Sequence, residues 1–149
     1  MKKIETIKKE SEELIKKMID DFTLEVFEEN NVFYVNIKTK EASAIIGRYG
    51  ETIRSLQKIL EVILYKIFGQ SIEILVNVND FRQKQKEKLE DLVESLAKKI
   101  EETGEEQTIN NLSSYERKII HQLVAAQYPN LTSYSTGEGK QRKLIITKK

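Results

Sequence analysis

Residues 45–56 of the chain read IIGRYGETIRSL, and this stretch decides the first half of the fold. Gly47 and Gly50 bracket two residues at the point where one helical pattern ends and a longer one begins. Glycine lets the backbone take positive φ angles and approach a ligand closely. The following helix directs free N–H groups and its positive dipole end at the same loop. The stretch therefore predicts either a phosphate-holding loop, charged by Arg48 and by Arg54 one turn further on, or a plain helix–helix turn.

The segments on both sides of this loop show helical and strand periodicities. Helices are expected over residues 2–21, 41–46 and 51–68, and strands over 22–26, 33–37 and 72–78. Asn30-Asn31 suits a tight turn between the first two strands, because asparagine tolerates positive φ. The long helix has apolar residues at the 3.6-residue period, and these are expected to face the core: Ile53, Leu56, Leu60, Ile63 and Ile67.

A second unit is expected to begin at Asn79-Asp80. Residues 81–102 and 113–128 read as helices, 107–110 as a short strand, and 131–136 with 143–147 as a hairpin. Ser113 and Glu116 have the spacing of a capping box at the start of the second helix. The chain is therefore predicted to hold two small α+β domains, at residues 1–79 and 80–149.

Arg117 and His121 lie four residues apart on the helix over 113–128, so they share one face. Such a pair is either an ordinary surface pair or a binding pair. A guanidinium can hold a phosphate with two hydrogen bonds, and an imidazole can donate to a phosphate or stack on a base.

The pattern I-I-G-x-x-G-x-x-I-x-x-L, within this order of elements, resembles the KH domain in its type II arrangement. The resemblance covers about residues 10–79. It implies a loop that clamps about four nucleotides of a single strand beside an apolar groove. The residues that would form this site are Ile46, Gly47, Arg48, Tyr49 and Gly50.

Two residues of this site have a second interpretation. Glu51 directly follows the loop, where its carboxylate stabilises the helix dipole but repels an incoming phosphate. Tyr49 either stacks on a base or covers apolar surface.

Residues 115–121, which read YERKIIH, resemble the R-x-x-x-H ("R-three-H") domain together with YSTGEG at 134–139 and Arg142. This resemblance covers about residues 80–149. It implies a face that binds single-stranded nucleic acid through Arg117 and His121. Arg142 and Lys143, on the hairpin, would extend that basic face.

A KH domain followed directly by an R-x-x-x-H domain resembles the bacterial Jag family, also called KhpB. The resemblance implies a post-transcriptional RNA-binding regulator connected with cell shape through elongation or division, or with sporulation. It leaves a second KH protein open as a partner. Jag proteins commonly begin with an extra small domain, which this chain is expected to lack.

The composition limits the function classes. Cysteine is absent, which excludes disulfides and thiolate zinc sites, and the formal net charge of +1 means that any anion site is local. There is no Walker loop, nucleophile elbow or H-E-x-x-H motif, so neither an enzyme, nor a metal, nor a cofactor is expected. No segment approaches the roughly 20 apolar residues of a membrane span, so the chain is expected to be cytoplasmic without membrane insertion.

Two function hypotheses remain at this point. The first is binding of single-stranded RNA, although the motifs accept single-stranded DNA equally. The second is a protein-interaction adaptor with weak or vestigial nucleic-acid binding, which would dock through the helix at 2–21 or the helix at 81–102. The near-neutral charge and Glu51 motivate this alternative.

Overall fold

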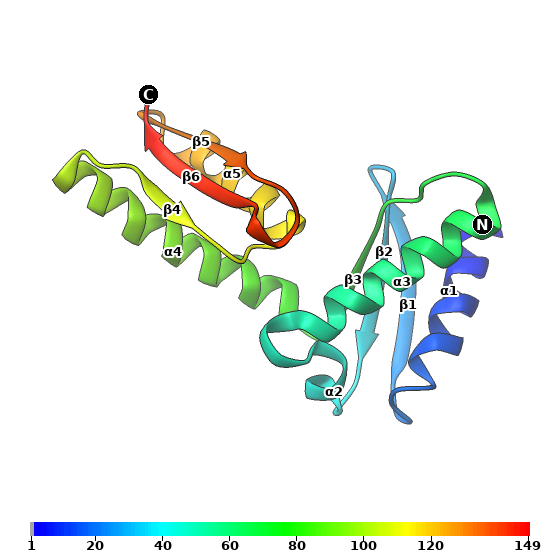
Figure 1. Ribbon diagram of the computed structural model, residues 1–149. Coiled ribbons are helices and arrows are strands. Elements are labelled where there is room, and N and C mark those ends of the chain that lie inside the picture. Colours follow the sequence, from blue (N-terminus) through cyan, green and yellow to red (C-terminus); the bar gives the residue numbers. More distant parts are fainter. Residues whose placement is uncertain (1) are drawn as a thin grey trace. The chain divides into compact units, whose positions relative to one another are not determined.

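The computed structural model describes residues 2–149, apart from the side chain of Tyr49. The chain forms two compact units, Met1–Arg82 and Gln83–Lys149, and each contains a three-stranded sheet (Figure 1). The expected α+β class is confirmed. Among the helices of the described residues, none combines the length and apolar character that crossing a bilayer requires.

The first unit has the element order expected of a type II KH arrangement. Its elements are α1 (Lys2–Ile15), β1 (Thr23–Glu29), β2 (Val32–Lys38), α2 (Ala42–Ile46), the 3₁₀ turn η1 (Arg48–Gly50), α3 (Glu51–Phe68) and β3 (Ile74–Val78). The strand order is β1-β2-β3, with β1 antiparallel and β3 parallel to β2. Asn30 and Asn31, at φ 51° and 64°, form the tight turn between β1 and β2.

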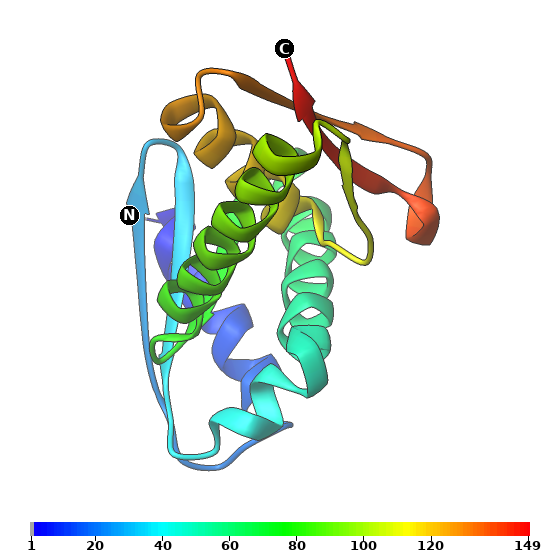
Figure 2. The same ribbon diagram turned by 90° about the vertical axis from the view of Figure 1, so that its left-hand side faces the viewer.

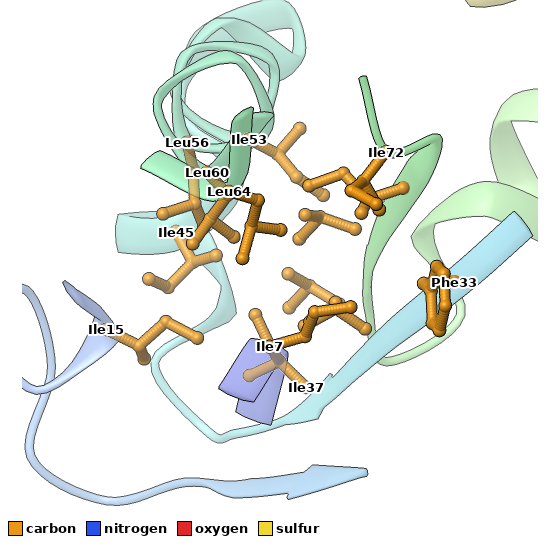
Figure 3. Close-up of a cluster of buried hydrophobic side chains, with 14 of the residues drawn as sticks. Ile7, Ile15, Phe33, Ile37, Ile45, Ile53, Leu56, Leu60, Leu64 and Ile72 are labelled. Carbon is orange, nitrogen blue, oxygen red and sulfur yellow. The ribbon is translucent and has the colours of Figure 1, made fainter. Parts of the chain in front are cut away.

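The core of the first unit lies between one face of this sheet and the helices. Figure 3 shows Ile7 and Ile15 of α1 and Leu60 and Leu64 of α3 pointing toward the same apolar cluster as Ile37 of β2. Alternation along each strand puts every second side chain on this face. The helices thereby hold the loop between α2 and α3 at a defined place on the unit.

Two expectations about the helices of this unit are wrong in detail. The first helix ends at Ile15 rather than at residue 21, because the chain turns and buries Ile19 at 3% exposure. Within α3 the core takes Leu64, which is 0% exposed, whereas Ile67 is 47% exposed. Leu64 continues the buried stripe of Leu56 and Leu60 at four-residue spacing, and Ile67 falls to the side of this stripe.

The second unit is built from α4 (Phe81–Thr103), β4 (Gln107–Ile109), α5 (Ser114–Gln127), β5 (Leu131–Thr136), the 3₁₀ turn η2 (Gly139–Gln141) and β6 (Lys143–Lys148). Its strand order is β4-β6-β5 and both pairings are antiparallel, so β6 is central. The pair β5 and β6 is seen from a second side in Figure 2. Helix α4 begins in the last two residues of the first unit.

Both helices of the second unit contribute to one apolar cluster with the sheet. Its buried residues are Leu89, Val93, Ala97, Ile100, Ile119, Ile120, Leu123, Val124, Leu131, Leu144 and Ile146. Leu131 of β5 and Leu144 and Ile146 of β6 therefore mark the sheet face that α5 covers. Residues at alternate positions, such as Tyr134, lie on the opposite face.

Candidate nucleic-acid interface

The loop between α2 and α3 has a backbone conformation that residues with a side chain rarely adopt. Gly47 ends α2 at φ 73°, ψ 179°, and Gly50 precedes α3 at φ 73°, ψ 17°. The first conformation is accessible essentially to glycine alone, and the second is the left-handed helical region. Both glycines thus have positive φ, which suits a phosphate-holding loop and a plain helix–helix turn alike.

Each glycine also has a neighbour that excludes a side chain. A Cβ on Gly47 would overlap the side chain of Thr52, and a Cβ on Gly50 would lie 3.1 Å from Cζ of Phe81. The loop is therefore packed tightly against the start of α3 and against the residues that open α4. This packing fixes the position of the backbone from which the Arg48 side chain extends.

The side chains around this loop differ in exposure. Arg48 and Arg54 are exposed, and Ile46 is half-buried against the core. Ile53 is buried at 1% exposure and supports the loop from below. The side chain of Tyr49 lies outside the described residues. Arg48 therefore places a solvated positive charge beside the N-terminal end of α3, where the helix dipole also favours an anion.

The second site begins with the N-terminal cap of α5. Ser113 accepts a hydrogen bond from the backbone N–H of Glu116 at 3.1 Å, and the Glu116 carboxylate accepts one from the backbone N–H of Ser113 at 3.0 Å. This confirms the capping box. Arg117 donates from Nη1 to the carbonyl oxygen of Leu112 at 2.7 Å and from Nη2 to Oγ of Ser114 at 3.1 Å. A guanidinium has five N–H donors, so these two bonds orient the group and leave further donors for a ligand.

His121 lies one turn after Arg117 and contacts two serines of β5. Its Nδ1 is 2.7 Å from Oγ of Ser133, and its Nε2 is 3.1 Å from Oγ of Ser135. Both ring nitrogens are thus engaged, and the ring is fixed between α5 and the strand. The two serines share the face of β5 that carries buried Leu131, as alternation requires.

Two arginines act on this imidazole electrostatically. Partial burial of the ring, followed by the positive charges of Arg117 and Arg142, lowers the pKa of His121 from its usual value of 6.5. Arg142 directly precedes β6 and donates from Nη1 to the carbonyl oxygen of Gly137 at 2.8 Å. The structure therefore brings together Arg117, His121 and Arg142 from two separate segments.

Lys143 does not join this cluster. It begins β6 and is exposed, and alternation from Leu144 directs it to the sheet face opposite the one that α5 covers.

Ser133 and Ser135 were not predicted from the sequence as site residues. Their signal was a pair of hydroxyl residues at inward-facing positions of an alternating strand.

Comparisons with known proteins find sequence matches that span both units. The family model of the R-three-H domain matches residues 87–148. Over 147 residues the chain is 29% identical to RNA-binding protein KhpB of Streptococcus pneumoniae serotype 2, which covers 96% of this chain and 44% of that protein. RNA-binding protein KhpB of Bacillus subtilis strain 168 is 33% identical over 116 residues, or 76% of this chain and 55% of that protein.

A third relative covers the largest share of both chains among these three. RNA-binding protein KhpB of Clostridium symbiosum is 28% identical over 154 residues, which is 99% of this chain and 69% of that protein. The chain spans less than half the length of the Streptococcus pneumoniae protein. The R-x-x-x-H motif identified in the second unit thus lies within the matched region. Residues 87–148 are an R-three-H domain, and the chain is a distant homologue of the KhpB proteins over nearly its whole length.

Proposed function

We propose that this chain binds single-stranded RNA through two sites, one in each unit. The first site comprises Ile46, Gly47, Arg48, Tyr49 and Gly50 with Arg54, and the second comprises Arg117, His121 and Arg142. The role proposed for this binding is post-transcriptional regulation of cell elongation, division or sporulation, which rests on the likeness to the Jag family. Its proposed location is the cytoplasm.

One observation carries the proposal most directly. Arg117 and Arg142, 25 positions apart in the sequence, both place positive charge at His121, while the whole chain has a net charge of only +1. Such local concentration of guanidinium groups suits a phosphate, which accepts paired hydrogen bonds from arginine. That the curated relatives are RNA-binding proteins supports the choice of RNA.

The presence of two sites on one chain has an energetic consequence. A strand held at one site is presented to the other at a high effective concentration, so the two together bind more tightly than either alone. Loss of one site is then expected to weaken binding without abolishing it.

The test is a fluorescence-anisotropy titration with labelled single-stranded RNA, single-stranded DNA and duplex RNA at two salt concentrations. Contacts to about four phosphates predict a log–log salt slope near −3 on single strands. The double variant Arg48→Asp/Tyr49→Asp and the variant Arg117→Ala are each expected to weaken binding. Unchanged affinity in both would contradict the proposal.

A matched control exists at the other end of α3. Tyr65→Asp/Lys66→Asp makes the same change in charge as Arg48→Asp/Tyr49→Asp, but in the last turn of the helix instead of before its first. Tyr65 is 57% exposed, so this change is compatible with folding. The control is expected to keep RNA binding within about twofold, which separates a local effect from a change of net charge.

A second candidate function, docking of a second KH protein, has its own observation. Along α3 the side chains of Ile59, Val62, Tyr65 and Ile67 are between 47% and 61% exposed. Grouped exposed apolar residues are typical of interaction surfaces. Light scattering across a concentration series, with Val62→Asp as the comparison, tests self-association through α3. A monomer at every concentration would count against another copy of this chain as the second KH protein.

A further inference from the structure

His121 is held by two hydroxyl groups instead of by a carboxylate, and this choice of partner has a chemical consequence. Ser133 and Ser135 contact Nδ1 and Nε2 at 2.7 and 3.1 Å. A neutral imidazole has one donor nitrogen and one acceptor nitrogen. One serine must then donate its only hydroxyl proton to the ring, while the other accepts from the ring and keeps its proton.

Protonation of the ring changes what the serine pair can offer. In the imidazolium form both nitrogens donate, so both serine oxygens accept and both hydroxyl protons are released for another partner. A neutral His121 thus presents one free hydroxyl proton, and a charged His121 presents two. A phosphate oxygen only accepts hydrogen bonds, so it favours the second arrangement.

Once an anion is bound, the charges around the ring also favour the imidazolium form of His121. Arg117 approaches from α5 and Arg142 from the residue before β6, and both disfavour a charged imidazole. Lys118 is exposed on α5, Glu138 and Lys140 lie exposed in the β5–β6 connection, and Lys143 lies on the other sheet face. The serines of β5 carry no charge. A phosphate beside the two guanidinium groups would neutralise the repulsion that they exert on His121.

We propose, on the basis of the RNA-binding function above, that Ser133 and Ser135 bind a backbone phosphate of the strand and that His121 takes up a proton when they do so. His121 then acts as a positioning residue that sets the hydrogen-bond polarity of the serine pair. The phosphate contacts the two hydroxyls together with Arg117 and Arg142. No bond is made or broken in this step apart from the transfer of a proton from solvent to the ring.

The direction of the pH effect follows from this coupling. If the bound form holds the proton more strongly than the free form, affinity rises as the pH falls through the pKa of His121 in the complex. One coupled proton gives a change of at most about tenfold in affinity per pH unit. Below the pKa of the free protein the affinity becomes constant.

The first experiment uses the unaltered chain. His121 is the only histidine, so its ring signals in an NMR spectrum are assigned without ambiguity. The pKa of His121 is measured by titration from about pH 5 to 8 with and without an oligouridine strand, whose own groups do not titrate in that range. The pKa is expected to be higher in the complex, and an unchanged or lower pKa would overturn the proposal.

The second experiment uses variants of β5. Ser133→Ala/Ser135→Ala is expected to weaken oligouridine binding at pH 6 by at least about tenfold and to remove most of its pH dependence. Thr132→Ala/Thr136→Ala removes two hydroxyls from the opposite face of the same strand and is expected to change neither. His121→Gln is expected to abolish the pH dependence while retaining a hydrogen bond to one serine.

The outcomes separate this inference from the function on which it rests. Salt-sensitive, Arg117-dependent RNA binding with no effect of the serine variant would overturn the serine proposal and leave the RNA-binding function in place. Absence of single-strand binding at every pH would overturn both.

Discussion

The side chain of Thr52, in the first turn of α3, fills the space that a side chain on Gly47 would need. The two residues are five positions apart, yet they pack together because the loop doubles back before the helix begins. Glycine is therefore required at position 47 for two reasons, the backbone angles and the lack of a Cβ atom. The loop that presents Arg48 depends on this contact.

Replacing Gly47 by alanine is expected to lower the free energy of unfolding of the first unit by about 3 kcal/mol and to weaken RNA binding. Gly69→Ala is the matched control. Gly69 also has positive φ, at 69°, but nothing lies within 4 Å of its Cβ position, so only about 1 kcal/mol should be lost. Urea unfolding of both variants compares them, and equal losses would mean that the Thr52 contact is unimportant.

Leu64→Ala is expected to destabilise the first unit by about 2–5 kcal/mol, because it opens a cavity in the core at a fully buried position. Ile67→Ala, three residues further along the same helix, removes a side chain that is 47% exposed and should cost about 0.5 kcal/mol. Chemical denaturation of both variants gives the comparison. A larger loss for Ile67→Ala would mean that Ile67 packs in the core, as expected from the sequence, and that Leu64 does not.

Ser113→Ala is expected to lower the free energy of unfolding of the second unit by about 1 kcal/mol, since it removes the cap of α5. It should also weaken RNA binding modestly, because Arg117 is anchored to the carbonyl oxygen of Leu112 beside that cap. Ser95→Ala, at an exposed position of α4, should leave both quantities unchanged. Thermal unfolding and anisotropy measure the two effects.

The stability of the free protein is expected to fall as the pH drops below about 6.5. The pKa of His121 is lower in the folded chain than in the unfolded chain, so the unfolded chain binds more protons in this range. The free energy of unfolding therefore rises with pH through this window and levels off above it. Urea unfolding at pH 5.5, 6.5 and 7.5 measures the slope, and His121→Gln should flatten it because the chain has no other histidine.

Features set by neighbouring residues could be predicted from the sequence. The capping box of Ser113 and Glu116 and the turn at Asn30 and Asn31 depend on residues within four positions of each other, and both were confirmed. The Gly47 loop was predictable for the same reason.

Features set by distant residues could not be predicted. The early end of α1 follows from burial of Ile19, and the buried face of α3 is chosen by the sheet that it covers. The contacts of His121 with Ser133 and Ser135 span 12 and 14 positions and require β5 to lie beside α5. Sequence periodicity shows which residues share one face of a helix or strand, but not which other segment packs against that face.

The central place of β6 in the second sheet has a consequence for synthesis on the ribosome. Among residues 2–149, β4 and β5 pair with β6 and with no other strand, whereas the strands β1, β2 and β3 of the first unit are complete at Val78. The first unit can therefore fold while the rest of the chain is still being translated. The second unit has no sheet until residues 143–148 have left the exit tunnel, so a ribosome that stalls before them would hold out a folded KH-like unit followed by an unpaired hydrophobic segment open to chaperones.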